Sequence, residues 1–479
     1  MNYKMVFYTI GQLLKIEALL MILPLIVSII YQENTYGYFL VAIIALLLLG
    51  FLLSIKKPKK TIIYAREGFV IVGAAWIIMS FFGALPFTLS GEIPNYIDAI
   101  FETVSGFTTT GATILNNVEA LTKGMLFWRS FTHWIGGMGV LVFVLAVLPN
   151  TDGDSIHILR AESPGPQVGK IVSKVRFTAR ILYCIYVAMT LLQMIFLVCG
   201  EMNLYEAIVH SFSTAGTGGF GIKNDSIASY STYSQIVITA FMILFGVNFN
   251  MFYLLLLGNF KAVLKNEELK WYFGIILVST VVITINIISI VGNAGKSILQ
   301  AIFQVSAIIT TTGFATADFE TWPALSQSIL LVLLFMGASA GSTGGGLKVS
   351  RIMIIIKSIK REVKKLLHPK SVSSVKIEGK PLNDEVVRGT QVYFLTYIVI
   401  MVAGILLISV DNFDFATNFT AIATCINNVG PGLGLVGPTD NFGCFSLFSK
   451  TILSMVMLIG RLEIYPILML LNYKTYTNK

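Results

Sequence analysis

Long apolar runs and short polar loops alternate along this chain, and one arrangement of them occurs four times. Each copy contains a long apolar segment, a much shorter one, an uncharged loop rich in glycine and threonine, and a second long apolar segment. A helix needs about 20 residues to cross roughly 30 Å of hydrocarbon, so the short segments cannot span it. They are predicted to be re-entrant helices, which enter the membrane and turn back. These short segments are residues 95–107, 203–214, 297–309 and 414–426.

The longer apolar segments are predicted to be transmembrane helices. Two of them, residues 10–30 and 38–55, precede the four copies and form a hairpin. The others form an outward and an inward span in each copy, at residues 67–88 and 125–148, 181–199 and 234–257, 271–291 and from 324 onward, and 392–410 and 446–471. We therefore predict an all-α polytopic membrane protein with ten transmembrane helices, in which four pseudo-fourfold repeats surround one pore.

The repeats also set the expected division of the chain. Their period of about a hundred residues is far too long for a solenoid, so each repeat is a complete membrane unit. The expected units are an N-terminal two-helix hairpin at 1–60 and four pore repeats at 61–165, 166–265, 266–375 and 376–479.

The four polar loops share a register that ends at a glycine. Successive glycines lie 108, 94 and 117 residues apart, and we number the loops 1 to 4 in chain order. Their residues are Thr108, Thr109, Thr110 and Gly111 in loop 1, Gly216, Thr217, Gly218 and Gly219 in loop 2, Thr310, Thr311, Thr312 and Gly313 in loop 3, and Asn427, Asn428, Val429 and Gly430 in loop 4.

These loops have the chemistry of a cation selectivity filter. Irregular backbone at membrane depth must be buried in protein or line water, and inward-facing carbonyls can replace the hydration shell of a cation, as in potassium-channel filters. Glycine adopts positive φ without steric cost, and no loop carries the Arg or Lys that an anion filter needs. Close packing by small residues is the alternative for a single loop, whereas four matched copies favour the filter. The cation, which the family resemblance given below implies to be K⁺, is predicted to bind at Thr109, Thr110, Gly218, Thr311, Thr312, Asn428 and Val429.

The inward span of the third repeat is too long for one straight helix. From Ala324 to Ser358 it would extend about 52 Å at roughly 1.5 Å per residue. Each glycine inside a helix costs up to about 1 kcal/mol, and residues 337–346 contain five. We predict that this glycine-rich segment is a movable gate below the filter, and a static kink is the alternative. The predicted gate residues are Gly337, Ser339, Gly341, Ser342, Thr343, Gly344, Gly345, Gly346 and Arg461.

Arg461 is included because a charged side chain within an apolar run is costly and marks a functional site. It is predicted to face the permeation path or to bond the glycine-rich segment, and the alternative is a salt bridge to a carboxylate on another helix. Glu463 lies two positions away, on roughly the opposite helical face, and is not the expected partner. Glycines at the same place in the four inward spans are Gly136, Gly246, Gly337 and Gly460.

Composition and charge agree with a membrane protein. Hydrophobic residues make up 55% of the chain and charged residues 12%, against about 25% charged in a soluble domain. The net charge of +9 comes largely from basic loops between the repeats, which the positive-inside rule assigns to the cytoplasm together with both termini. The four histidines show no metal-ligand spacing and the four cysteines no CxxC motif, which argues against an enzyme or a metal centre.

Aromatic and histidine residues near the outer helix ends are given structural roles. Trp128 with Arg129, and Trp322, are predicted to anchor the chain at the membrane–water interface. His133 and His210 are predicted to be hydrogen-bonded packing residues rather than proton carriers.

The motifs TTTGAT, GGFG, TTTGFAT and NNVGPGLG in the loops, with HWIGGMG after loop 1 and GASAGSTGGG in the third repeat, resemble the Trk/Ktr/HKT superfamily of potassium transporters. The resemblance covers the whole chain, and ten spans resemble the Trk branch more than the eight-span Ktr branch. It implies K⁺ uptake, with Rb⁺ and some Na⁺ also passing, by a homodimer in the cell inner membrane with one pore per protomer. It also implies control by a cytoplasmic nucleotide-binding protein such as TrkA, and no tightly bound cofactor. Loop 4 departs from the other loops in its asparagines, which makes the filter unequal around its axis.

Two other mechanisms stay open at this point. A proton- or sodium-coupled potassium symporter is one alternative, and a membrane-embedded enzyme is a more remote one. The basic residues after the glycine-rich segment are expected to contact anionic membrane lipids or an acidic regulatory protein, and no nucleic-acid partner is expected. These residues are Lys357, Lys360, Arg361, Lys364, Lys365 and Lys370.

Overall fold

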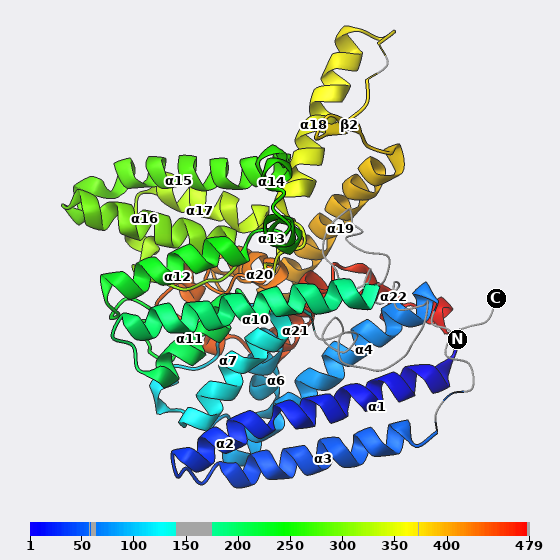
Figure 1. The fold of residues 1–479 in the computed structure, drawn as a ribbon, viewed down its shortest axis with the longest axis vertical. Helices are drawn as coiled ribbons and strands as arrows, with labels where there is room; N and C mark the ends of the chain where they lie inside the picture. Colours follow the sequence, from blue (N-terminus) through cyan, green and yellow to red (C-terminus); the bar gives the residue numbers. More distant parts are fainter. Residues whose placement is uncertain (57, 59–63, 140–174, 372, 477–479) are drawn as a thin grey trace.

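The computed structural model describes residues 1–56, 58, 64–139, 175–371 and 373–476, which form an almost entirely helical protein (Figure 1). The strands among these residues, β1 (Lys376–Ile377) and β2 (Lys380–Pro381), pair antiparallel in a small hairpin. The predicted all-α class is therefore confirmed. Short 3₁₀ helices lie at Val118–Ala120, Phe319–Thr321, Ser409–Asp411, Gly434–Val436, Phe442–Cys444 and Tyr473–Thr475.

The N-terminal hairpin consists of α1 (Tyr3–Leu20), α2 (Ile22–Ile30) and α3 (Tyr36–Ser54). Helices α1 and α3 pack backbone to backbone at two glycines. A Cβ atom on Gly11 would lie 2.8 Å from the carbonyl oxygen of Gly50, and one on Gly50 would lie 2.9 Å from that of Gly11. Small residues permit this close approach, which is typical of helix pairs in membranes.

Each repeat begins with a long peripheral helix and continues with a short one. The long helices are α4 (Ala65–Gly83) with its extension α5 (Leu85–Ser90), α10 (Val175–Cys199), α15 (Glu267–Val291) and α19 (Asp384–Ile408). The short helices are α6 (Tyr96–Phe107), α11 (Leu204–Ala215), α16 (Ala294–Ile309) and α20 (Phe415–Asn427). An Asn or Asp side chain caps the N-terminus of each short helix by accepting a backbone N–H. The short helices match the predicted segments to within three residues at either end.

In the second long segment of each repeat, the first helix ends within one residue of the aligned glycine. The helices before and after these points are α7 (Lys123–Gly137), α12 (Thr232–Phe245) and α13 (Phe249–Leu256), α17 (Ala324–Met336) and α18 (Val349–Leu367), and α21 (Leu447–Arg461) and α22 (Tyr465–Leu471). The break predicted in the third repeat is present. Residues 140–148 of the predicted span 125–148 lie outside the described residues.

Helix breaks that the sequence analysis did not predict lie within the inward spans 234–257 and 446–471. Helices α12 and α13 meet at 92°, because Asn248 accepts the N–H of Asn250 and starts a new helix. Between α21 and α22, Glu463 and Ile464 have φ of +55° and +70°, which no right-handed helix can accommodate. The basic helix α14 (Phe260–Lys265) then connects α13 to the third repeat.

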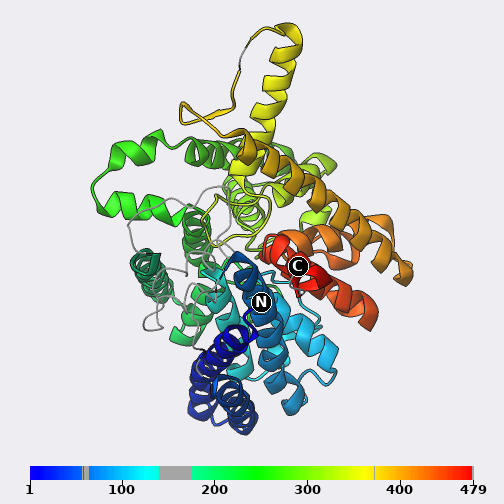
Figure 2. The same ribbon diagram turned by 90° about the vertical axis from the view of Figure 1, so that its right-hand side faces the viewer.

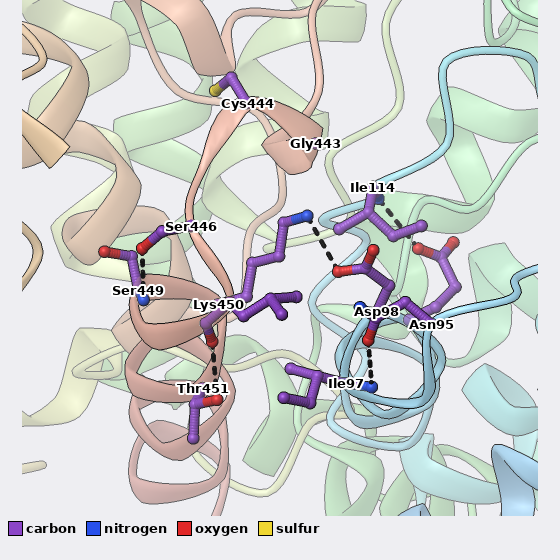
Figure 3. A network of polar contacts seen from close by, with 12 residues as sticks. Asn95, Ile97, Asp98, Ile114, Gly443, Cys444, Ser446, Ser449, Lys450 and Thr451 are labelled. Carbon is purple, nitrogen blue, oxygen red and sulfur yellow. Dashed lines mark hydrogen bonds and ion pairs between the residues drawn. The ribbon is translucent and has the colours of Figure 1, made fainter.

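The four repeats form a closed ring, because the second long helix of each repeat packs on the short helix of the next. The packed pairs are α7 with α11, α12 with α16, α17 with α20, and α21 with α6. The last pair joins repeat 4 to repeat 1, and Lys450 of α21 reaches Asp98 of α6 there, with Nζ and Oδ1 2.9 Å apart (Figure 3).

The length and composition of the helices fit a polytopic membrane protein. Within the described residues, six helices are long and apolar enough to cross a membrane, or seven if α12 and α13 form one span. The Tyr3 hydroxyl donates to the Tyr476 carbonyl at 3.1 Å, so the two ends of the described chain lie together on one face of the helical body. This is the face turned toward the viewer in Figure 2. This arrangement requires an even number of crossings. The count of ten and the division into units stay predictions, and the boundaries at 60/61 and 165/166 fall outside the described residues.

Candidate functional site

Loops 1 to 4 form the C-terminal ends of the four short helices, and each loop begins in the same way. The second residue of each loop has φ between +53° and +59°. The N–H of the third residue donates to the carbonyl five residues earlier, which together with the second residue forms a Schellman motif. These bonds are Thr110 to Ser105 at 2.9 Å, Gly218 to Ser213 at 2.8 Å, Thr312 to Ala307 at 2.8 Å and Val429 to Thr424 at 3.0 Å.

The fourth residue of each loop is the aligned glycine, and it too is left-handed. The φ values are +79° for Gly111, +81° for Gly219, +78° for Gly313 and +99° for Gly430. Residues with a Cβ adopt this region at a cost of about 1–2 kcal/mol, whereas glycine does so freely. Left-handed residues at the second and fourth positions therefore give all four loops the same backbone conformation at these positions.

The glycine that ends each loop contacts the third carbonyl of the following loop. The contact is so close that a Cβ atom on the glycine would overlap the carbonyl oxygen. The distances from such a Cβ to the oxygen are 2.1 Å for Gly111 and Gly218, 1.9 Å for Gly219 and Thr312, 1.9 Å for Gly313 and Val429, and 2.8 Å for Gly430 and Thr110. Because the fourth contact returns to loop 1, the loops enclose one common axis with these four carbonyls around it.

A cavity lies on the side of the loops away from the short helices. Its volume is about 150 Å³, and all four loop glycines line it. The segments that follow the loops, including Lys223 and Asp440, and Arg129 from α7 complete the lining. The ring of loops can therefore be approached from this side through a polar space.

Arg129 is buried beside this cavity in an ion pair. Its Nε lies 2.5 Å from Oε1 of Glu102, and its Nη1 donates to the Gly221 carbonyl at 2.9 Å. Glu102 also accepts the Thr113 hydroxyl at 2.9 Å and the Ile114 N–H at 3.0 Å. A buried ion pair needs such additional hydrogen bonds to offset its desolvation. The pair fixes the chain that leaves loop 1.

The prediction that Trp128, Arg129 and Trp322 are interfacial anchors is wrong. Their exposed fractions are 0%, 3% and 5%. The Trp128 indole donates to the Gly83 carbonyl at 2.9 Å, inside the protein. A tryptophan beside an arginine in an apolar run has the same sequence pattern whether the two lie at the membrane interface or inside the protein. The carboxylate that pairs with the buried arginine, Glu102, is distant in sequence, so the pattern does not reveal it.

The side chains of the two asparagines of loop 4 bond the loop to neighbouring elements. The side-chain amide of Asn427 donates to the Tyr397 hydroxyl on α19 at 2.8 Å. That of Asn428 donates to the Thr110 hydroxyl of loop 1 at 2.9 Å and to the Met457 carbonyl of α21 at 3.0 Å. The departure from threonine thus places two amides between the loop and its neighbours.

The glycine-rich segment 337–346 lies directly against the ends of the loops nearest the short helices. The Gly345 N–H donates to the Thr311 hydroxyl of loop 3 at 2.7 Å. A Cβ on Gly345 would lie 2.5 Å from the Asn427 carbonyl oxygen of loop 4. The segment therefore packs against the first and second residues of loops 3 and 4, away from the loop glycines that line the cavity.

The same segment is bound to the second repeat. The Ser339 N–H donates to the Gly246 carbonyl at 3.1 Å, and the Thr343 hydroxyl donates to the Phe245 carbonyl at 3.2 Å. These carbonyls are available because α12 ends there and leaves its last carbonyls without helical partners. The break in the second repeat thus supplies the acceptors that hold the glycine-rich segment of the third.

Arg461 bridges three repeats below the loops. Its Nη1 donates to the Thr343 carbonyl of the glycine-rich segment at 2.8 Å. Its Nη2 donates to the Gly137 carbonyl at the end of α7 at 2.9 Å, and also to the Gly136 carbonyl. The structure therefore brings together Arg461 and the segment, as the sequence led us to expect.

Two further ionic contacts hold the start of α18, and sequence reasoning missed both. Arg351 forms a bidentate pair with Glu463, with the closer N–O distance at 2.5 Å. Glu268 accepts the N–H groups of Ala340 at 2.7 Å and Ser350 at 3.2 Å, which ties α15 to the glycine-rich segment and to the first turn of α18. Glu463 had been set aside only as a partner of Arg461, and Glu268 gave no signal beyond its place at a helix start.

A helical membrane protein in which four repeated loops enclose one axis, with a polar cavity on one side and a glycine-rich segment packed against the other, belongs to the class of pore-loop transport proteins. The family model described as "TrkH: Cation transport protein" matches residues 36–475. The chain is 35% identical to the Trk system potassium uptake protein TrkH of Salmonella typhimurium over 478 residues, which cover 98% of each protein. It is 34% identical to that of Escherichia coli K12 over 480 residues, again 98% of each.

Solved structures agree with this assignment. The crystal structure of the potassium transporter TrkH from Vibrio parahaemolyticus is similar over 100% of both chains, with a TM-score of 0.90 and 30% sequence identity. The chain therefore belongs to the TrkH family of cation transport proteins. The predictions of a membrane transport protein, rather than an enzyme, are confirmed.

Proposed function

We propose that this protein takes up K⁺ into the cell along the axis enclosed by loops 1 to 4. The observation that supports this most is the closed ring of third carbonyls, one from each loop. An uncharged ring of backbone oxygens can replace the water around a monovalent cation, as in potassium-channel filters. Relatives of the same fold that are named potassium uptake proteins support K⁺ over another cation. The proposed location is the cell inner membrane with cytoplasmic termini, and no resident cofactor is required.

The ions are proposed to bind at backbone oxygens of the second and third loop residues. In loops 1 and 3 the hydroxyls of the first and third threonines bond each other at 2.8 Å, which engages them away from an ion. The Thr109 hydroxyl, by contrast, is buried and lacks a hydrogen-bond partner among the described residues. It is a candidate ligand at the inner end. The proposed ion-binding residues are Thr109, Thr110, Gly218, Thr311, Thr312, Asn428 and Val429.

The glycine-rich segment is proposed to be the gate, and Arg461 is proposed to hold it in the closed position. The segment bonds to loop 3, and Arg461 ties it to α7 of another repeat, which supports a closed position across the axis. Five glycines in ten residues allow the segment a second position. Arg461 also places a positive charge below the ring, which opposes the passage of cations.

Uptake of ⁸⁶Rb⁺ into liposomes that contain the purified protein tests the proposed function. External K⁺ should compete strongly with ⁸⁶Rb⁺, whereas Na⁺ and Li⁺ should compete weakly. The reversal potential should follow the K⁺ gradient alone. Equal competition by Na⁺ would contradict a K⁺ filter, and a reversal potential that also follows pH or Na⁺ would replace the channel mechanism by symport.

The protein is further proposed to work as a homodimer with a cytoplasmic nucleotide-binding regulator. Helix α18, which carries all of the basic residues predicted to contact lipid or a regulator except Lys370, extends beyond the helical body in Figure 1 and starts shortly after the glycine-rich segment. Lys357 pairs with Glu267, and Arg361 pairs with Asp384 at 3.1 Å. The basic residues that remain exposed are Lys360, Lys364, Lys365 and Lys370.

Replacing these four exposed lysines by glutamine should weaken capture of the regulator, because the positive surface that would meet an acidic partner is lost. Pull-down of a nucleotide-binding partner from the native membrane extract measures it. A matched control replaces Lys261, Lys265 and Lys270, which are also exposed and basic but lie on α14 and α15. Equal recovery with both variants would leave anionic lipid as the partner of α18.

A further inference from the structure

Loops 1 and 3 each carry a pair of threonine hydroxyls behind the backbone. In loop 1 the hydroxyls of Thr108 and Thr110 are 2.8 Å apart, and that of Thr108 donates to the Val104 carbonyl at 2.6 Å. Thr310 and Thr312 repeat the arrangement in loop 3, also at 2.8 Å. Each pair ties the third loop residue, whose carbonyl belongs to the ring, to the short helix before it.

Loop 2 has glycine at both of these positions, so it has no hydroxyl pair. The imidazole of His133, from α7 of the preceding repeat, occupies the vacant space. A Cβ on Gly218 would lie 2.2 Å from Nδ1 and 2.3 Å from Cγ of His133. A Cβ on Gly216 would lie 2.2 Å from the His133 carbonyl oxygen. His133 is 0% exposed, so its ring is enclosed by the surrounding protein.

Helix α7 also holds the residues that follow loop 2. The His133 ring stacks on Phe220, with centroids 4.2 Å apart and planes 19° apart. One turn earlier on α7, Arg129 lies over the same phenyl ring at 3.4 Å and donates to the Gly221 carbonyl at 2.9 Å. Residues 216–221 are therefore in contact with one face of α7, because positions four apart lie on the same side of a helix.

We propose that His133 is a positioning residue for loop 2, whose imidazole replaces the hydroxyl pair of loops 1 and 3 and holds the Gly218 carbonyl in the ring. The proposal rests on the K⁺ function proposed above. His133 does not touch the ion. A backbone with glycine at both the first and the third position has more conformational freedom than the threonine loops, and a rigid ring packed against it removes that freedom.

The test is a double-mutant cycle that measures the K⁺ over Na⁺ permeability ratio in liposomes. Gly218→Ala should lower the ratio about tenfold, because its methyl group meets the His133 ring, and His133→Ala should lower it because loop 2 loses its support. The variant with both changes should have a ratio closer to the parent than Gly218→Ala alone, since the methyl group then has space. A ratio for the double variant equal to the product of the two single effects would overturn the proposal.

A matched control is Gly221→Ala, where the nearest atom to the added Cβ is at 3.4 Å, and its ratio should equal that of the parent. His133→Ala only removes atoms, so it is expected to assemble even if Gly218→Ala does not. An unchanged ratio in His133→Ala would by itself contradict the positioning role. A parent without K⁺ preference would instead refute the proposed function, and the role of His133 in it would fall too.

Discussion

Replacing Arg461 by alanine should raise ⁸⁶Rb⁺ flux through the isolated protein by about tenfold or more. Arg461 donates hydrogen bonds to Thr343 of the glycine-rich segment and to Gly137 at the end of α7. Hydrogen bonds from a charged donor contribute about 1.5–3 kcal/mol each, and about 1.4 kcal/mol corresponds to a tenfold change in an equilibrium. Their loss should shift the segment away from the axis and remove a positive charge from the path.

Two companion variants separate these causes. Arg461→Lys keeps the charge but lacks the planar guanidinium that bonds two carbonyls at once. It should therefore raise flux if the hydrogen bonds to the segment matter more than the charge. Deletion of residues 341–345 should raise flux as well, and combining it with Arg461→Ala should add little, because both remove one barrier. The K⁺ over Na⁺ ratio should change little in all of them. If variants that fold and insert conduct no faster than the parent, the segment is a static kink.

Replacing Gly219 by alanine should lower the K⁺ over Na⁺ permeability ratio at least about tenfold, the largest loss of selectivity that we expect. Gly219 has φ of +81°, and an added Cβ would lie 1.9 Å from the Thr312 carbonyl oxygen, one of the four in the ring. The methyl group must therefore push that carbonyl from its place or force loop 2 to change conformation. Competition of K⁺ and Na⁺ with ⁸⁶Rb⁺ in liposomes measures the ratio.

The matched control is Gly91→Ala. Gly91 has φ of +78°, nearly that of Gly219, but an added Cβ would have no atom within 4 Å. The control should lose about 1–2 kcal/mol of stability from the backbone conformation alone and keep the parent ratio. Equal ratios in the parent and in Gly219→Ala, with the protein correctly assembled, would mean that the ring does not set selectivity.

Segment lengths and internal repetition predicted much of this fold. The limits of the short helices followed from apolar runs too short to span a membrane, and the loops followed from four glycines in register. The breaks after Phe245 and Arg461 did not follow, because the apolar pattern continues through Gly246-Val247-Asn248 and past Arg461. What ends those helices is local: an asparagine cap in one case and two left-handed residues in the other.

Contacts between residues distant in sequence were the second feature that the sequence predicted only in part. The grouping of Arg461 with the glycine-rich segment could be predicted, since a costly charge and a helix break both lie just below the loops. The pairing of Arg129 with Glu102 could not, because neither the spacing nor the residue type distinguishes a buried arginine from an interfacial one. The place of His133 behind Gly218 depends on the order of the repeats around the axis, which a sequence without contacts does not contain.

The contacts between loops have a direction, and this gives the ring a rotational sense. The glycine of each loop touches the carbonyl of the loop that follows it in the chain, so Gly313 contacts Val429 of loop 4, and Gly430 contacts Thr110 of loop 1. A bulky substitution at one glycine should therefore disturb its successor first and its predecessor last. Although all four loops belong to one ring, a displacement of one loop should therefore be transmitted around the ring in one direction, from each loop to its successor, rather than equally to both neighbours.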